Sequence, residues 1–322
     1  MVEHNLGDEH APTIEEIEGV ADYEVQLESL NQWQIAWRRF KRHRLAVIGS
    51  VLFIGMCLVA ILGPVIFPYN FLDIKKPDVL VFAGRPPSWV SGDFSPFLLM
   101  GETARFQRDV FTLVINGARL SLIIGVGSTV ISVVIGALWG GIAGYFGGIL
   151  DSVMMRIVDS LLAVPILFLI LVFSRFLGRG SWVTVLLIFG FFGWLGIARL
   201  VRSLFLSLRE EQFVDAARAV GVSDQRIIIR HILPNALSPI IVSATLGVAG
   251  VIVSEAFVSF LGFGVDPNTP TWGNILSNSL EFVNQGNWWW AFFPGLAIVI
   301  TVLGINFMGD GLRDALDPRS RA

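Results

Sequence analysis

The chain has few of the residues on which soluble enzymes and metal proteins depend. Only 15% of its 322 residues are charged and 54% are hydrophobic, a composition that disfavours a soluble globular domain. The one cysteine, Cys57, cannot form an intrachain disulfide and lies inside an apolar run, which indicates a small apolar filler. The four histidines do not group as metal ligands, so no metal site is expected.

Sequence signatures of ATP hydrolysis and of serine hydrolases are also missing. There is no G-x-x-x-x-G-K-[ST] phosphate loop, since none of the lysines (Lys41, Lys75 and Lys76) follows a glycine. The G-x-S-x-G nucleophile elbow is absent as well. We therefore predict that the chain is not an enzyme by itself and that it holds no cofactor of its own.

Long apolar runs dominate the chain. A transmembrane helix needs about 20 predominantly apolar residues, and six runs reach that length. They are approximately Leu45–Phe67, Asn116–Gly144, Ser152–Phe173, Trp182–Leu204, Leu237–Leu261 and Ala291–Met308. The pattern predicts an all-α membrane protein with six transmembrane helices.

The positions of the basic residues predict how the chain is oriented across the membrane. Five of them lie between Arg38 and Arg44, directly before the first run, and six more lie between Arg199, near the end of the fourth run, and Arg230, in the loop that follows it. By the positive-inside rule these regions are cytoplasmic, and an even number of spans puts both termini there. The expected segments are an acidic cytoplasmic tail (1–37), a first transmembrane helix with an outer loop (38–114), a core transmembrane domain (115–309) and a cytoplasmic C-terminus (310–322).

The loop between the fourth and fifth runs, 209–235, is amphipathic. Four apolar residues follow the i, i+3, i+4, i+7 spacing of one helical face, which we expect to be exposed for docking: Phe213, Ala216, Ala217 and Val220. Asp215 and Arg218, three residues apart, can form an ion pair.

Glycine and proline residues predict where the helices of this loop end. Gly221 is expected to end the first helix because it accepts a left-handed backbone conformation. Ser223 or Asp224 can cap a second helix, which we expect to end by Pro234. The pattern therefore predicts a pair of short helices that dock on a partner protein.

The same residues carry a family resemblance. Asp215–Ala217, Gly221 and Ile232–Pro234 resemble the EAA loop of ABC-transporter permeases, with aspartate in place of the usual glutamate. Further matches are FKRHRLAVIG (40–49), NGARLSL (116–122), AGYFGG (143–148), RHILPNAL (230–237), SEAFVSFLGFGVDPNTPTWG (254–273) and FPGLAIVITVLGINFMGDGLRDALDPR (293–319). Together they are similar to the dipeptide/oligopeptide/nickel permeases, in the DppC/OppC-type branch.

The resemblance implies a type I ABC importer permease of the MetI-like fold in the cell (plasma or inner) membrane. It implies a second homologous permease subunit, two cytoplasmic ABC ATPases that bind ATP and Mg²⁺, and an extracytoplasmic substrate-binding protein. The bilayer is the remaining partner, and no nucleic acid is expected. The EAA-like loop would couple the chain to the ATPases.

Two features inside the membrane runs leave alternatives open. Gly136, Gly140 and Gly144 recur every four residues, which favours close helix packing within this chain or a seam that slides during transport. Glu255 lies near the outer end of the fifth run and could face the translocation path or form a hydrogen bond between helices.

The substrate is less well defined by the sequence. The family's peptide permeases carry a G-T-D-x-x-G-R-D run where this chain reads GETARFQRD, Gly101–Asp109. The resemblance implies di- or oligopeptides, with nickel or oligosaccharides as the alternative. A different class, an ATP-independent secondary carrier, predicts buried charges and repeated halves, and neither is evident.

Overall fold

The structure, a computed structural model of the whole chain, describes residues 32–66, 84–91, 99–104, 108–176 and 180–316. Its described regular structure is helical, apart from two isolated β-bridges. The acidic tail lies outside the described residues as far as residue 31, and so does the C-terminal segment from residue 317. The all-α class expected from the apolar runs is confirmed.

Five helices within the described residues are long and apolar enough to cross a membrane. They are α3 (Arg44–Ile66), α5 (Val110–Phe146), α8 (Trp182–Leu208), the continuous helix over Asp224–Phe260, and α13 (Trp288–Leu316). Each contains one of the predicted runs or most of it, because an unbroken apolar sequence favours a helix whose backbone polar groups pair internally.

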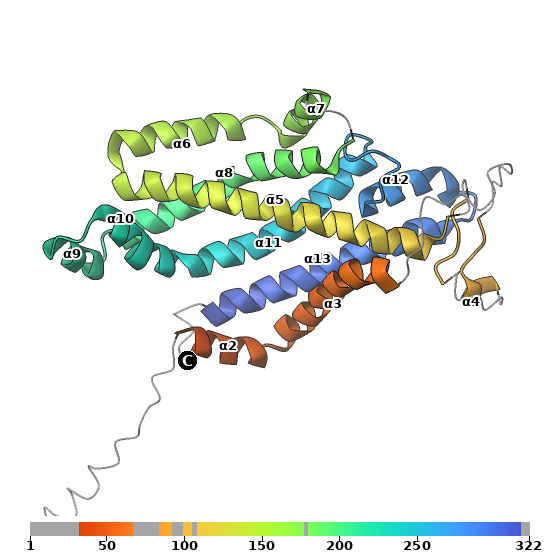
Figure 1. Cartoon of the computed structure of the whole chain (residues 1–322), viewed down its shortest axis with the longest axis horizontal. Coiled ribbons are helices and arrows are strands. Elements are labelled where there is room, and N and C mark those ends of the chain that lie inside the picture. The colour runs from red at the N-terminus through yellow and green to blue at the C-terminus, as the bar shows by residue number, and fades with distance from the viewer. Residues whose placement is uncertain (1–31, 67–83, 92–98, 105–107, 177–179, 317–322) are drawn as a thin grey trace, which may run out of the picture.

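The third predicted run, Ser152–Phe173, is not one helix. It forms α6 (Gly148–Leu162) and α7 (Ile166–Phe176), which contain 15 and 11 residues. Pro165 lies between them, and a proline lacks the N–H that a continuous helix needs and disfavours helical geometry in the residue before it. Figure 1 shows α6 and α7 leading the chain back from the end of α5 to the start of α8, so the third run returns along the bundle as two helices.

The remaining helices are short and lie at the two ends of the bundle. They are α2 (Gln32–Arg42), α4 (Ser88–Ser91), α9 (Gln212–Ala219) and α12 (Trp272–Val283). Figure 1 shows α9 at one end of the bundle, with α2 and the C-terminal end of α13 on the same side, and α4 and α12 at the other end. We call these the α9 end and the α12 end.

The tightest helix packing lies between α5 and α8. A Cβ added at Gly140 would overlap the Ala198 carbonyl oxygen, and one at Gly144 would lie 2.7 Å from the Arg202 carbonyl oxygen. Gly136 likewise faces Trp194 and Ile197. All three glycines thus pack on α8 of the same chain, which is one of the two alternatives that the sequence left open.

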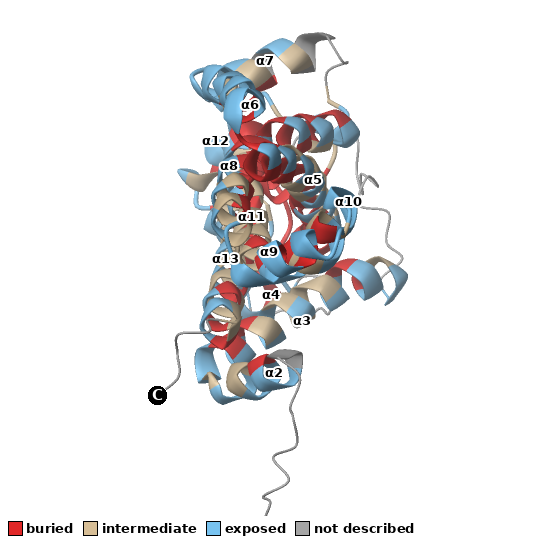
Figure 2. Cartoon of the chain, turned by 90° about the vertical axis from the view of Figure 1, so that its left-hand side faces the viewer, coloured by how far each residue is buried: buried red, intermediate tan, exposed pale blue. Residues whose placement is uncertain are grey.

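The outside of the bundle is apolar. Large hydrophobic side chains on α3 are widely exposed, such as Ile61 at 66% and Val65 at 75%. Figure 2 shows the buried residues concentrated in the middle of the bundle, with exposed residues on its outer helices. Such an exterior needs lipid or a partner protein to cover it.

Candidate functional site

Helix α9 is anchored to the bundle by one side and exposed on another. Val214 is fully buried and Ala217 is 8% exposed, and both belong to a hydrophobic cluster with Phe205 of α8 and Ile232. On the exposed side, Phe213 is 38% exposed, Val220 is 79% exposed and Ala216 is also exposed. The helix therefore presents a small apolar surface, formed by Phe213, Ala216 and Val220, at the tip of the α9 end.

The structure corrects the expected position of Ala217. The i, i+3, i+4, i+7 spacing predicts that Ala217 lies on the exposed face with Phe213, but it is 8% exposed and packs inward. Ala217 follows Val214 by three residues, so the two share a buried helical face, and Val214 is the apolar residue that the predicted face leaves out. The docking face is therefore narrower than expected, and Ala217 serves to hold α9 against the bundle.

Gly221 reverses the chain directly after α9. Its φ angle is +78°, in the left-handed region that side chains with a Cβ rarely adopt. The Gly221 N–H donates to the Arg218 carbonyl (2.9 Å) and the Val222 N–H donates to the Ala217 carbonyl (3.0 Å). These bonds close the helix end in the way that a C-terminal glycine cap does.

The second helix of the loop does not end at Pro234, so that expectation was wrong. Helix α10 (Asp224–Ile227) runs into a π-helical turn, η2 (Ile228–Ile232), and then into α11 (Leu233–Phe260). In the wider turn the Leu233 N–H donates to the Ile228 carbonyl. Pro234 follows as the second residue of α11, where its missing N–H costs little, and neighbouring turns adjust to it. The loop is thus a direct extension of a long apolar helix.

Tyr145, near the end of α5, contacts both helices of the loop. Its hydroxyl donates to Asp224 of α10 (2.5 Å), and its ring lies 5.8 Å from the guanidinium of Arg218 on α9. Arg218 also forms the expected ion pair with Asp215, at 3.4 Å. Ser223 occupies the N-cap position of α10, while Asp224 pairs with Tyr145 instead of capping.

Tyr145 was not predicted from the sequence as a functional residue. The signal in the sequence is one tyrosine in the AGYFGG stretch, at the end of an apolar run. At such a position the ring can pack on apolar side chains while the hydroxyl binds a polar partner.

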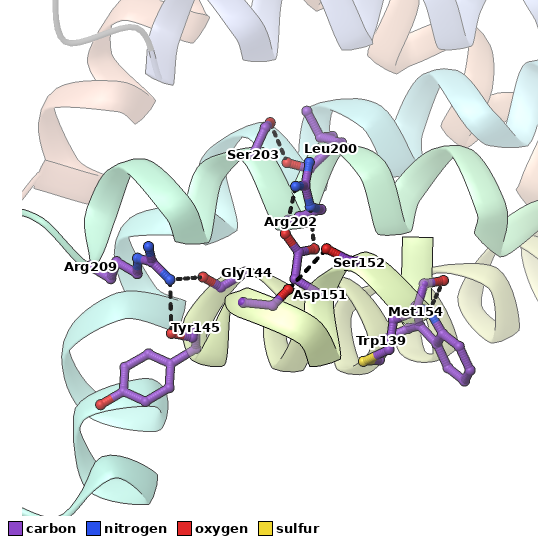
Figure 3. A network of polar contacts seen from close by, with 11 residues as sticks. Trp139, Gly144, Tyr145, Asp151, Ser152, Met154, Leu200, Arg202, Ser203 and Arg209 are labelled. Atoms are coloured by element: carbon purple, nitrogen blue, oxygen red, sulfur yellow. Dashed lines mark hydrogen bonds and ion pairs between the residues drawn. The ribbon is translucent and has the colours of Figure 1, made fainter. Parts of the chain in front are cut away.

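Two arginines at the end of α8 bind the neighbouring ends of α5 and α6. Arg202 makes two charge-assisted hydrogen bonds to Asp151 of α6, of 2.5 and 2.6 Å. Arg209 donates to the last carbonyls of α5, those of Gly144 (3.2 Å) and Tyr145 (3.3 Å), as Figure 3 shows. The ends of α5, α6 and α8 are therefore joined by one ion pair and by hydrogen bonds to backbone carbonyls.

Asp159 of α6 pairs with a different helix. Arg156 lies three residues before it, a spacing that allows a local ion pair, but Asp159 accepts a hydrogen bond from Arg199 of α8 at 2.5 Å. A partner on another helix cannot be found from spacing along one helix.

Glu255, the other candidate site residue, lies on α11 and is buried in the interior of the helix bundle. It is 0% exposed, and its Oε1 accepts a hydrogen bond from Ser259 at 2.8 Å. The hydroxyls of Ser121 and Thr271 lie beside the carboxyl group. A side chain so enclosed does not line the surface of this chain in this conformation, so the arrangement favours packing.

We predict that Tyr145→Phe loosens the loop. It removes a hydrogen bond to a carboxylate, of a kind worth about 1–3 kcal/mol, while keeping the ring beside Arg218. Hydrogen exchange of the amides in 212–227 should become faster than in the native chain. The matched control is Trp139→Phe, which removes another donor on α5, the Nε1–H that binds the Met154 carbonyl. Equal exchange in Tyr145→Phe and the native chain would contradict the assigned contact.

Two protein-family models match this chain. A family model described as binding-protein-dependent transport system inner membrane component matches residues 136–322, and one described as the N-terminal TM domain of oligopeptide transport permease C matches residues 31–80.

Curated relatives cover almost the whole chain. The dipeptide transport system permease protein DppC of Bacillus subtilis is 36% identical over 300 residues, 92% of this chain and 89% of the relative. A DppC of Alkalihalophilus pseudofirmus is 37% identical over 299 residues, 93% of this chain and 94% of the relative. The oligopeptide transport system permease protein OppC of Haemophilus influenzae is 36% identical over 307 residues, 95% of each chain.

Proposed function

This chain belongs to the family of binding-protein-dependent transport system inner membrane components, and from that premise we propose how it works in an ABC importer of peptides. It is a multi-pass membrane permease subunit. With a second, homologous permease it encloses the translocation pathway, and two separate ATPases supply the energy by binding and hydrolysing ATP with Mg²⁺. An extracytoplasmic binding protein delivers the di- or oligopeptide.

The observation that carries the proposal is the two-sided nature of α9. One side, Val214 and Ala217, is held by the bundle, and the other presents Phe213, Ala216 and Val220 at the tip of the α9 end. A small apolar surface on an anchored helix suits insertion into a cleft of a partner protein. We assign the α9 end to the cytoplasm because the basic residues before α3 and around the loop gather there.

The loop can transmit movement because it is joined to the membrane helices in two ways. Helix α10 continues through η2 into α11, so a push on α9 reaches a helix of the pathway directly. Tyr145 joins α9 and α10 to α5. When the ATPases close on ATP, the movement of α9 would shift α11 and α5 together, and the permease pair would switch between inward- and outward-open states.

Substitution at Ala216 tests the docking surface. The tagged full-length chain is purified in mild detergent from cells that carry its partners, and the co-purifying proteins are identified by mass spectrometry. We expect an ATPase and a second permease with the native chain, and at least a tenfold loss of the ATPase, about 1.4 kcal/mol, with Ala216→Asp. The charge would enter an apolar contact without a partner.

Two further variants make the result specific. Ala216→Ser adds one oxygen without charge and should retain the ATPase, while the second permease should remain with Ala216→Asp, because the membrane helices are untouched. If the native chain is purified alone in several detergents, or if Ala216→Asp retains the full amount of ATPase, the docking proposal is wrong. Uptake that persists after ATP depletion, with the membrane potential maintained, would then favour a secondary carrier.

A further inference from the structure

Helix α2 and the residues directly after it carry a cluster of positive charge at the α9 end of the molecule. No aspartate or glutamate occurs from residue 32 to residue 44, whereas five basic residues do: Arg38, Arg39, Lys41, Arg42 and Arg44. The neighbouring end of α13 adds Asp310, Asp314 and Arg313, so the region keeps an excess of positive charge. Such an excess attracts a partner surface of negative charge.

One side of α2 is held by the bundle. Ala36 is buried, and Figure 1 shows α2 beside the C-terminal end of α13. His43 follows α2, and its Nε2 lies 3.6 Å from a carboxylate oxygen of Asp314 on α13. The His43 Nδ1 accepts a hydrogen bond from the Ala46 N–H in the first turn of α3 (3.1 Å). These contacts hold α2 against the start of α3 and the end of α13.

The other side of α2 combines an exposed tryptophan with exposed charges. Trp37 is 57% exposed, and the Lys41 Nζ lies 4.9 Å from the centre of its ring. Arg38 and Arg42, four residues apart, form the neighbouring row of the helix surface. Lys41, Arg38 and Arg42 are exposed, and among the described residues none of them has an acidic partner. Tryptophan rings beside basic side chains are typical of helices that lie at a membrane surface.

The hydrocarbon layer begins within a few residues of these charges. Helix α3 is a membrane-spanning helix whose apolar sequence starts at Leu45, and Leu45 and Ile48 are both exposed in its first turn. Arg42 precedes Leu45 by three residues, which is at most about 11 Å of chain. This length is comparable with the Debye length of roughly 8–10 Å in physiological salt. The charges of lipid headgroups at that boundary therefore act on the basic residues of α2.

We infer that α2 lies on the bilayer surface and binds the phosphate groups of anionic phospholipids through Arg38, Lys41 and Arg42, with the Trp37 ring at headgroup level. An anionic lipid is favoured over a zwitterionic one because its headgroup adds no positive charge to a surface that already has an excess. The inference goes beyond the proposed function and requires no ATPase, second permease or binding protein. Lipid bound to α2 would hold the adjoining ends of α3 and α13 at the membrane surface.

A single fluorescent label beside the basic residues tests the inference in the full-length chain, reconstituted alone in lipid nanodiscs. Cys57 is the only cysteine, so Cys57→Ser combined with Ile35→Cys provides one labelling position. Ile35 is exposed and precedes Arg38 by three residues and Arg42 by seven, on the same side of the helix. The probes are phosphatidylglycerol and phosphatidylcholine, each with a nitroxide quencher on the acyl chain near the headgroup. Each is added at the same low mole fraction to a bilayer of unlabelled phosphatidylcholine.

The test variant is Arg38→Gln with Arg42→Gln, which removes two charges from α2. Its matched control is Arg226→Gln with Arg230→Gln, which removes two exposed arginines from the loop at the same end of the molecule. A basic residue close to an anionic surface contributes roughly fivefold to the affinity. We expect phosphatidylglycerol to quench the label at least threefold more strongly than phosphatidylcholine in the chain with native charges and in the control. The two lipids should quench about equally in Arg38→Gln with Arg42→Gln.

Salt gives a second measurement that needs no charge variant. High salt should reduce the preference for phosphatidylglycerol in the chain with native charges, because it screens exposed charges. Equal quenching by the two lipids in that chain at low salt, or a preference that survives in Arg38→Gln with Arg42→Gln, overturns the inference. A label that neither lipid quenches also overturns it, since protein would then cover α2, such as the acidic residues that precede it in the chain. Neither ATPase nor peptide takes part, so such a failure leaves the proposed function intact.

Discussion

In Gly221→Val, ATP-dependent peptide uptake is expected to be lost although the chain still inserts into the membrane. The backbone at this position is left-handed, with φ at +78°, which costs an L-residue roughly 1–2 kcal/mol, and a β-branched side chain adds further crowding. Among the described residues, an added Cβ would meet no atom within 4 Å, so the expected defect comes from backbone conformation and not from a collision. The turn between α9 and α10 should therefore shift, and with it the surface formed by Phe213, Ala216 and Val220.

The measurement is uptake of a labelled peptide into proteoliposomes that contain the whole transporter, alongside the amount of chain recovered from the membrane. Gly221→Asn is the matched control, since asparagine tolerates the left-handed region better than other side chains and should retain a large part of the uptake. Normal uptake in Gly221→Val would show that the turn geometry is not needed for coupling.

Local patterns were sufficient to predict the long helices and the first turn of the loop. Apolar runs of sufficient length leave little choice but a helix, because backbone polar groups in a bilayer must pair with one another. The end of α9 could be predicted because Gly221 carries a conformational preference of its own. In both cases the information lies within a few residues of the feature.

Features that depend on distant contacts could not be predicted in this way. Ala217 lies at the border of two helical faces, and its burial depends on a hydrophobic cluster to which other helices contribute, Phe205 and Ile232 among them. The hydrogen bond between Tyr145 and Asp224 joins residues 79 positions apart, so no local pattern could indicate it. The expectation for Pro234 failed for a different reason, because a π-helical turn can place a proline at the start of a new helical segment without breaking the chain direction.

In Gly140→Ala, the α5–α8 pair is expected to be forced apart. The new methyl group would press against the Ala198 carbonyl oxygen and lie 2.9 Å from the Arg202 backbone nitrogen. Both obstacles are backbone atoms, which cannot rotate away, so the cost should reach the upper part of the range of about 1–3 kcal/mol for overpacking. A fall of roughly 3–4 °C in the midpoint of thermal unfolding follows for a chain of this size.

The same variant distinguishes the two roles that the glycine ladder could have. The purified chain is heated in detergent and its monodisperse fraction is followed, with Gly250→Ala as the control, because a Cβ at that glycine would meet nothing within 4 Å among the described residues. If Gly136, Gly140 and Gly144 serve packing, stability and uptake fall together in Gly140→Ala. A seam that must slide would instead lose uptake at unchanged stability, and that result would contradict the packing role, since the close approach of α5 to α8 would then be dispensable for the fold.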